Sequence, residues 1–447
     1  MRSGNNRDDN RNRDRNRNRD KNLIKQVNKR SAGDAIKVVA VATVMMVAIS
    51  VILWYIGGVV NSDEGWFART PRETVPRQER TVAQEDESPA PPVPREAVRP
   101  AAPETVLTGI NYLEHGGEFE LPLQGATGWA ATGLTMRSQP SGSGGAVANL
   151  SPGQGFVIVD VNGGWWYVET ADGVTGWVDH RGCFINLPDI LPSIIYWNTN
   201  ASGSIMVSLG FDIPGVTGQT MYAARAFNER LGREEYMVAG MYGLARSLHV
   251  AQQYALENGE TLMVNEVFRP RDTQQAVVQG MNSLISENER VRLAVTTAPW
   301  SLGFFISTGI SNHQRGAAID ASIATIREYE YRQTGDFIYK HVLSYRELFM
   351  PSDMHELSPR AAIFDAPQRV TAAQMLAGNL RLAESVTPGV LRMQQAFARG
   401  GFTPLSSEWW HFDHPDSIAT ANNMNIRGDF STDTVHSRPP LLEANEL

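Results

Sequence analysis

Hydrophobic and polar positions form three patterns along the chain, and the first is one long apolar run. Residues 38–60, VVAVATVMMVAISVILWYIGGVV, have Thr43 and Ser50 as their only clearly polar side chains. A helix of this length crosses a bilayer core of roughly 30 Å. A cleaved signal peptide would have a shorter apolar core and would begin closer to the N-terminus. The pattern therefore predicts a single uncleaved transmembrane helix over residues 38–60.

The second pattern, over residues 125–187, consists of short β-type runs separated by turns. The runs GFVIVDV, WWYVET and VTGWVDH are divided by Asn162-Gly163 and Asp172-Gly173. Both dipeptides tolerate the positive φ angles of tight hairpin turns. We therefore expect a small all-β barrel or sandwich over these residues, which we call the β module.

The third pattern, over residues 188–427, mixes helical and strand periodicities. A helical pattern over residues 236–257 ends at Asn258-Gly259, and a strand-like run follows at once over residues 261–268. Such a pair commonly ends a helix because glycine accepts the left-handed conformation of the C-terminal cap. The regular β-α-β alternation of strands and helices that is typical of a parallel sheet is missing, so we expect an α+β domain with a mostly antiparallel sheet.

Charge is distributed very unevenly and sets the expected orientation. Residues 1–37 carry 12 Lys and Arg against 5 Asp, a net +7, whereas the rest of the chain carries −15. This Asn, Arg and Asp-rich tail lacks the apolar area to fold and is expected to be disordered. Since Lys and Arg stay on the cytoplasmic side, the N-terminus is predicted to be cytoplasmic and the large C-terminal portion extracellular, as in a single-pass protein of the cell membrane.

Two further segments complete the predicted organisation. Residues 61–124 contain acidic and Pro-rich sequence such as QEDESPAPPVPREAVRPAAPE, which predicts an extended extracellular linker. Residues 428–447 form a C-terminal tail. The acidic portion has no basic patch of the kind that binds nucleic acid, so no nucleic-acid partner is expected.

Several kinds of active site are excluded by the residues present. The chain has no G-x-S-x-G nucleophile elbow, and its C-terminal domain has neither G-x-G-x-x-G nor G-x-x-x-x-G-K-[ST]. The single cysteine, Cys183, leaves any metal site to His and carboxylate ligands. His355-Glu356 begins like the zinc-protease motif H-E-x-x-H, but Pro359 stands where the second His is required.

The stretch SNHQRGAAID and the later EWWH offer the residues of another kind of metal site. A catalytic zinc takes three protein ligands and leaves a fourth position for water. His313 and Asp320 supply two ligands if the chain reverses at Gly316, and His411, 98 residues after His313, supplies the third. Glu408 is then the spare carboxylate that serves as general base. Taken singly, each of these residues has an ordinary reading as a hydrogen-bonded turn residue or a solvated charge.

The motifs S-x-H-x-x-G-x-A-x-D, residues 311–320, and E-x-W-H, residues 408–411, resemble the zinc D-alanyl-D-alanine carboxypeptidases and dipeptidases of the bacterial cell wall. That family shares its fold with the hedgehog signalling domain. The resemblance implies Zn²⁺ as the cofactor, with His313, Asp320 and His411 as its ligands and Glu408 as the general base. Asp413 and His414, just past the second motif, depart from the usual family continuation. Two alternatives are open for them: one of the two supports a metal ligand from behind, or His414 competes as a ligand.

The stretch FRPRDTQ, residues 268–274, resembles the family's F/Y-R-x-x-x-x-Q setting. This likeness implies that Arg269 is catalytic, as a clamp for substrate oxygens or for the oxyanion. Arg271 competes for that role, and a surface ion pair with Glu266 or Asp272 is the alternative for Arg269.

Three residues are expected to bind substrate: Gln274, Ser311 and Trp410. Ser311 has the alternative role of shaping the turn. The runs GLTMRSQPSGSG, GWWYVE and TGWVDH of the β module resemble the bacterial Src-homology-3-like domain of cell-wall enzymes. This second resemblance implies a wall-targeting module, with a spacer as the alternative.

Together these features predict a membrane-anchored zinc D-alanyl-D-alanine carboxypeptidase that removes the terminal D-Ala from peptidoglycan stem peptides. Its partners would be the stem peptides and, through one helix, the lipid bilayer. A D-Ala-D-Ala dipeptidase and an endopeptidase for L-Ala-D-Glu type bonds are alternatives within the same chemistry. An inactive wall-binding protein is the alternative from another class. It predicts that Glu408→Ala leaves wall trimming in cells unchanged while deletion of residues 125–187 abolishes function.

Overall fold

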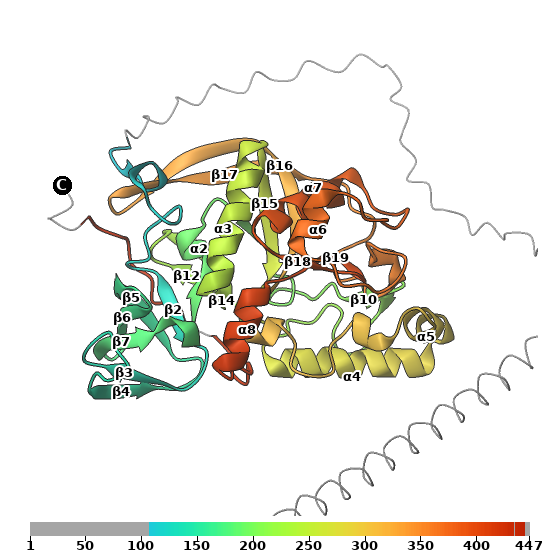
Figure 1. The fold of residues 1–447 in the computed structure, drawn as a ribbon, viewed down its shortest axis with the longest axis horizontal. Helices are drawn as coiled ribbons and strands as arrows, with labels where there is room; N and C mark the ends of the chain where they lie inside the picture. Colours follow the sequence, from blue (N-terminus) through green and yellow to red (C-terminus); the bar gives the residue numbers. More distant parts are fainter. Residues whose placement is uncertain (1–106, 433, 443–447) are drawn as a thin grey trace, which may run out of the picture. The chain divides into compact units, whose positions relative to one another are not determined.

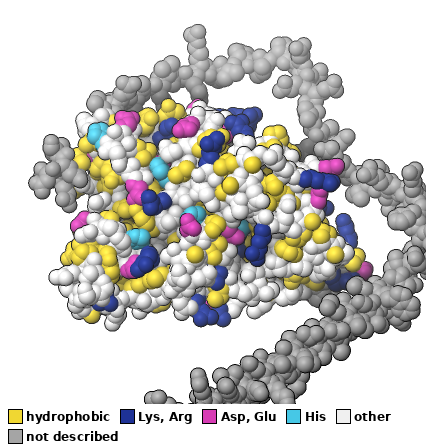
Figure 2. All heavy atoms as spheres, in the orientation of Figure 1, with side chains coloured by type: hydrophobic (Ala, Val, Ile, Leu, Met, Phe, Trp, Pro, Cys, Tyr) yellow, Lys and Arg dark blue, Asp and Glu magenta, His cyan; other side chains and the backbone are white. Residues whose placement is uncertain are grey.

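The computed structural model describes residues 107–432 and 434–442 (Figure 1). The predicted tail, the predicted span at residues 38–60 and the linker up to residue 106 lie outside the described residues. Within the described part, no helix is both long enough and apolar enough to cross a membrane. On the face drawn in Figure 2, acidic and basic side chains are interspersed, so neither sign of charge dominates it.

The β module forms most of an eight-stranded sheet in the order β14-β8-β2-β5-β6-β7-β3-β4. Its strands are β2 Thr127–Ala130, β3 Leu134–Arg137, β4 Ala146–Leu150, β5 Gly155–Asn162, β6 Trp165–Thr170, β7 Thr175–Asp179, β8 Cys183–Asn186 and β14 Ala239–Met241. The two predicted turns are present: Gly163 has φ 57° between β5 and β6, and Gly173 has φ 79° between β6 and β7. Trp129 and Trp166 are fully buried in the core of this sheet.

The second large sheet belongs to the α+β part and is seven-stranded. It contains β1 Ile110–Asn111, β9 Ile195–Tyr196, β15 Glu260–Glu266, β16 Ala318–Thr334, β17 Phe337–Glu347, β18 Thr403–Leu405 and β19 Glu408–Asp413. The long strand β16 pairs antiparallel with β15, β17 and β19, and only the short β1 and β9 pair in parallel. The predicted mixed α+β class, with a mostly antiparallel sheet, is confirmed.

Helices α3 and α7 pack against this sheet, and α3 also contacts β8 of the β module (Figure 1). The helices are α2 Leu187–Ile190, α3 Tyr242–Glu257, α4 Arg271–Glu287, α5 Glu289–Thr296, α6 Ala372–Ala377, α7 Pro388–Arg399 and α8 Pro415–Asn423. Short 3-10 turns are η1 Leu113–His115, η2 His180–Gly182, η3 Leu302–Phe304, η4 His313–Arg315 and η5 Pro359–Ala361. Two small hairpins, β10 Val207–Ser208 with β11 Phe211–Asp212 and β12 Arg225–Asn228 with β13 Arg233–Tyr236, complete the fold.

The helix predicted over residues 236–257 begins later, at Tyr242. Tyr236 is the last residue of β13, and residues 239–241 form β14, which pairs with β8. Backbone pairing with distant strands therefore overrides the helical periodicity of these residues. The predicted end of the helix is confirmed, because Asn258 is the C-cap and Gly259 follows with φ 70°.

Residues on both sides of the β module are folded into the same unit. Phe119 and Leu121, within the segment predicted as linker, are fully buried, and β1 pairs with β17. The C-terminal segment returns to the β module, where Trp129 Nε1 donates to the carbonyl oxygen of Thr434 at 3.0 Å.

The β module also touches the turn that carries the SNHQRGAAID motif. Gly316 has φ 59°, and a Cβ at this position would lie 2.6 Å from the Phe184 ring of β8. The Phe184 ring packs against Phe268 at 5.2 Å, and Phe268 stacks on Phe430 at 5.0 Å between ring centroids. The backbone N–H of Met241 donates to the carbonyl oxygen of Gly316 at 2.9 Å. The β module is thus a wall for the motif and not a separate appendage.

Candidate metal centre

Strand pairing places two of the candidate ligands, Asp320 and His411, directly opposite each other. In β16, Asp320 is paired with His411 of β19 on one side and with Glu266 of β15 on the other. His313 lies in η4, directly before β16, and Gly316 turns the chain between them. The predicted reversal at Gly316 is therefore present, and it places His313 above the start of the strand that carries Asp320.

Donor atoms of His313, Asp320 and His411 form a nearly equilateral triangle. His313 Nε2 lies 3.1 Å from His411 Nδ1 and 3.2 Å from Asp320 Oδ1, and His411 Nδ1 lies 3.1 Å from Asp320 Oδ1. Zinc bonds of roughly 2.0–2.1 Å at tetrahedral angles hold donor atoms about 3.3 Å apart. The three side chains are buried and fit one zinc ion.

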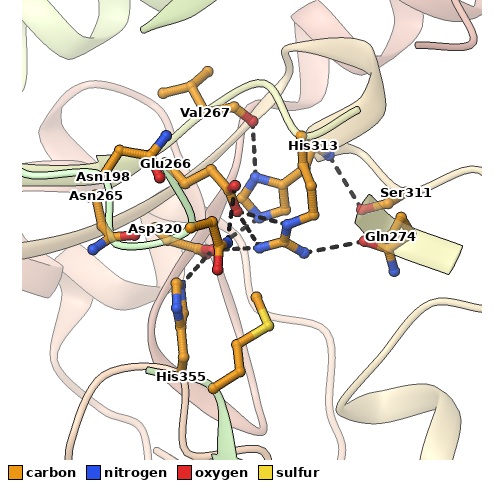
Figure 3. Close-up of polar contacts among 12 residues, drawn as sticks. Asn198, Asn265, Glu266, Val267, Gln274, Ser311, His313, Asp320 and His355 are labelled. Atoms are coloured by element: carbon orange, nitrogen blue, oxygen red, sulfur yellow. Dashed lines mark hydrogen bonds and ion pairs between the residues drawn. The ribbon is translucent and has the colours of Figure 1, made fainter. Parts of the chain in front are cut away.

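In His313 and His411, the ring nitrogen that points away from the triangle has a hydrogen-bond partner. His313 Nδ1 lies 2.8 Å from the carbonyl oxygen of Val267 (Figure 3), and His411 Nε2 lies 3.1 Å from Oδ1 of Asp413. A neutral imidazole that donates its one proton outward keeps a lone pair on the inner nitrogen. Two lone pairs and a carboxylate oxygen then converge on one point, which is the arrangement that a cation stabilises.

The charged groups around this point shift one another's pKa values strongly. Burial alone would raise the pKa of the Asp320 carboxyl, but the neighbouring histidines hold it well below its usual range. Burial likewise disfavours the charged form of His411, yet hydrogen bonds to Asp320 and Asp413 raise the pKa of this ring well above its usual value. A proton and a metal ion therefore compete for His411 Nδ1.

Glu408 lies beside the triangle, as the general-base hypothesis requires. Its Oε2 is 3.9 Å from His411 Nδ1, and the residue is only 6% exposed. Burial raises the pKa of Glu408 to about 8. A metal cation at the triangle would lower this pKa again, because an opposite charge favours the carboxylate.

Arg269 is buried beside Asp320. The ion pair with Glu266 named as its alternative is present, but it lies in the interior and not at the surface. Arg269 Nε donates to Glu266 Oε2 at 2.6 Å, Nη2 donates to Asp320 Oδ2 at 3.0 Å, and Nη1 donates to Gln274 Oε1 at 3.1 Å. The competing Arg271 is half exposed and pairs with Asp429 at 2.8 Å. Arg269 lines the cleft that contains the triangle, whereas Arg271 does not.

A second group of acidic and histidine side chains, Glu266, Asp320 and His355, is also close enough to hold a metal (Figure 3). Here, however, the guanidinium of Arg269 already binds both carboxylates. The Tyr222 hydroxyl also donates to Glu266. A metal cation would have to displace or repel Arg269, so this group is better described as an ion-pair network.

His355 is the residue of the site that sequence reasoning missed. Its Nε2 lies 3.1 Å from Asp320 Oδ2, so it fixes the carboxylate oxygen that the triangle does not use. Its backbone has φ 63°, a costly conformation for a residue with a side chain. The neighbouring Glu356 accepts from the N–H groups of Leu209 and Gly210 and holds this loop in place. No motif spacing signals the contact, because H-E-x-x-H fails at Pro359 and the partner is 35 residues away.

The three expected substrate-binding residues all line the cleft. Ser311 Oγ accepts from the N–H of His313 at 3.3 Å, which is the alternative role of shaping the turn. Gln274 holds Arg269 with Oε1 and donates through Nε2 to the carbonyl oxygen of Ser307 at 2.8 Å. Trp410 is only 1% exposed and forms part of the wall.

His414 does not join the metal group. Its Nδ1 contacts Ser417 Oγ at 2.7 Å, where it caps α8, and its Nε2 contacts Ser247 Oγ at 2.9 Å. The hypothesis that it competes as a ligand is wrong. Asp413, its neighbour, instead supports His411 from behind.

Two family models match parts of the chain. The family model described as D-Ala-D-Ala dipeptidase matches residues 212–428, which include the whole triangle, Glu408, Arg269 and His355. The bacterial SH3 domain model matches residues 132–182. Among curated proteins, none matches the chain. Residues 212–428 therefore match the D-Ala-D-Ala dipeptidase family, a match that points to a metallopeptidase, and residues 132–182 match the bacterial SH3 domain.

Proposed function

We propose that this protein is a zinc D-alanyl-D-alanine carboxypeptidase that removes the terminal D-Ala from peptidoglycan stem peptides. The observation that carries the proposal is the triangle of His313 Nε2, Asp320 Oδ1 and His411 Nδ1, with edges of 3.1 to 3.2 Å, next to the buried carboxylate of Glu408. The family match supports peptide hydrolysis at D-alanyl bonds. The bacterial SH3 domain supports a polymeric wall substrate.

Each residue has a defined task in the reaction. Zinc bound by the triangle would polarise the scissile carbonyl and lower the pKa of a water molecule. Glu408 accepts a proton from the attacking water and delivers it to the amide nitrogen that leaves as an amine. Arg269 fixes Asp320 and adds positive charge to the cleft, which stabilises the oxyanion of the tetrahedral state. His355 contacts Asp320 Oδ2, so Oδ1 is the oxygen that would bind the metal.

The free dipeptide D-Ala-D-Ala is the second candidate substrate. The cleft around the triangle encloses only about 180 Å³, a small space that accepts a short ligand without further contacts. The matched family is also described by its dipeptidase activity. An endopeptidase for L-Ala-D-Glu type bonds would use the same catalytic residues on another bond.

The test is product analysis with the purified full-length protein. A stem pentapeptide ending in D-Ala-D-Ala, the free dipeptide and a peptide with an L-Ala-D-Glu bond are each incubated with Zn²⁺ and after chelation, and the products are identified by mass spectrometry. We expect metal-dependent release of a single D-Ala from the pentapeptide. Release of no product from any of the three in the presence of Zn²⁺ would refute peptidase function, and cleavage of the dipeptide alone would favour the second candidate.

Metal content tests the site itself. Zinc bound per chain should fall in His313→Ala and His411→Ala and should stay near the wild-type level in His414→Ala, which serves as a matched histidine control. Equal zinc in all four proteins would contradict the proposed ligands. The alternative of an inactive wall-binding protein predicts wall trimming that is unaffected by Glu408→Gln.

The proposed location is the outer face of the cell membrane, anchored by residues 38–60 with the N-terminus in the cytoplasm. The only cysteine, Cys183, is buried, so a thiol reagent should label the wild-type protein only weakly. A membrane-impermeant maleimide should label the exposed Ser301→Cys in intact cells and should label Asn10→Cys only after lysis. Labelling of both, or of Asn10→Cys alone, in intact cells would contradict this topology.

A further inference from the structure

A second cavity adjoins the metal cleft, and we call it the arginine cavity after Arg271 and Arg427, which line it. It encloses about 420 Å³, more than twice the volume of the metal cleft. Gln274, Ser307 and Ile310 line both cavities and form their common wall. The two cavities are therefore neighbours, and a ligand that occupies both must pass over this common wall.

Hydrogen bonds through Gln274 connect the common wall to Arg269. Gln274 accepts from Arg269 Nη1 on the metal side and donates to the carbonyl oxygen of Ser307 at 2.8 Å. Two hydrogen bonds hold the backbone at Arg427. Gln314 Nε2 donates to the carbonyl oxygen of Arg427 at 2.9 Å, and the backbone N–H of Arg271 donates to the carbonyl oxygen of Gly428 at 3.0 Å. The cavity is thus built on the same turn and helix as the metal site.

The charge of the arginine cavity is positive. Arg271 pairs with Asp429, the one acidic residue of the lining, through an ion pair whose side chains are 52% and 44% exposed. Such an exposed pair is weak. Within the described residues, the Arg427 side chain has neither an ion pair nor a hydrogen bond, so one positive charge remains without a partner. A guanidinium in this situation suits a carboxylate, which it can bind through two parallel hydrogen bonds.

We propose that the arginine cavity binds a carboxylate-bearing residue of the substrate peptide, upstream of the scissile bond, with Arg427 as the residue that recognises it. The inference rests on the proposed function. In a carboxypeptidase only one residue lies beyond the scissile bond, so the remainder of the peptide must extend away from the metal on the N-terminal side. An acidic stem peptide has a carboxylate to place beside Arg427, whereas the free dipeptide D-Ala-D-Ala has no residue that reaches the cavity.

The test compares two pentapeptides that end in D-Ala-D-Ala. One has a free carboxylate upstream of the scissile bond, and in the other this carboxylate is amidated. The ratio of kcat/KM for the acidic over the amidated peptide is measured for the full-length wild type, for Arg427→Gln and for Arg381→Gln. Arg381 is a matched control because its side chain is 91% exposed and lines neither cavity.

We expect the ratio to fall roughly tenfold in Arg427→Gln, mainly through KM, since a hydrogen bond to a charged group is lost. Arg381→Gln should keep the wild-type ratio. A ratio that is unchanged in Arg427→Gln, or lowered equally by Arg381→Gln, would overturn the proposal.

A binding measurement separates this proposal from the proposed function. If the wild type cuts neither peptide, peptidase function fails, but the arginine cavity is still tested by calorimetric titration of zinc-loaded Glu408→Gln with both peptides. Tighter binding of the acidic peptide, lost in the double variant with Arg427→Gln, would support the cavity. Equal binding of the two peptides would refute it.

Discussion

Replacing Gly316 by alanine perturbs the point where the β module meets the metal-binding turn. Gly316 is left-handed with φ 59°, and its N–H donates to the carbonyl oxygen of His313 at 2.9 Å. An added Cβ would lie 2.6 Å from one carbon of the Phe184 ring and 2.9 Å from a second. Either the ring or the turn must move, and the turn carries His313.

The magnitude follows from two separate costs. An alanine in the left-handed region costs about 1–2 kcal/mol relative to glycine. Forcing an extra methyl against a packed aromatic ring adds about 1–3 kcal/mol. Gly259 provides a matched control, because its φ is 70° and a Cβ there would meet no atom within 4 Å. Gly259→Ala should lose only the free energy of the left-handed conformation, so the difference in stability between the two variants measures the contact with Phe184.

The assay is urea unfolding together with the zinc dissociation constant, both measured on the purified full-length protein. We expect Gly316→Ala to be destabilised by about 2–5 kcal/mol and to bind zinc more weakly, and Gly259→Ala to lose only about 1–2 kcal/mol and to bind zinc normally. Adding Phe184→Leu should restore part of the stability that Gly316→Ala loses, so the losses in unfolding free energy of the two single variants should not add up in the double variant. If both glycine variants lose equal stability and bind zinc equally well, the β module does not support the metal turn.

The same contact changes how the β module can be tested. Deleting residues 125–187 would remove Phe184 and the strand to which β14 pairs. The deletion would therefore damage the metal turn as well as any wall-binding surface. It cannot distinguish a binding protein from an enzyme, whereas Glu408→Gln can.

Four further predictions concern single residues. Glu408→Gln should lower kcat by roughly 10²–10⁴-fold while zinc content is retained, because only the proton acceptor is lost; a parallel loss of zinc would assign Glu408 to metal binding instead. His355→Ala should weaken zinc binding roughly 10–100-fold, and His355→Gln should restore part of it, since an amide N–H can replace the donor to Asp320; unchanged affinity in both would show that this contact is dispensable. Arg269→Met should destabilise the fold by about 3–5 kcal/mol in urea unfolding, because Glu266 would be left as a buried charge without its cation; a stability loss below about 1 kcal/mol would contradict the buried ion-pair network. Burial raises the pKa of Glu120 from 4.5 to about 7, so the folded protein binds more protons than the unfolded chain between these values. Stability should therefore fall as pH rises from about 4.5 to 7, by at most roughly 3 kcal/mol, and Glu120→Gln should flatten this part of the profile; an equally steep profile in the variant would assign the slope to other groups.

Local chemistry is what the sequence could predict well. Asn162-Gly163, Asp172-Gly173 and Asn258-Gly259 are found at turns or at a helix end, because each glycine lacks a Cβ and adopts a positive φ without steric cost. The spacing in S-x-H-x-x-G-x-A-x-D also predicts a local event, a reversal at Gly316 followed by a strand. Where backbone pairing with a distant segment competes, as at residues 236–241, the periodicity gave the wrong element.

The sequence by itself determined which side chains can form the metal centre, because histidine and carboxylate donors at this spacing are few. Only the tertiary structure decided how they are held. The carbonyl oxygen of Val267, the carboxylate of Asp413 and the ring of His355 fix the three ligands from behind. Two of these contacts join residues 46 and 35 positions apart, and Phe184 reaches Gly316 from another sheet. Contacts of this kind leave no periodic signal in the chain, because they depend on the register and packing of strands that meet only in the folded protein.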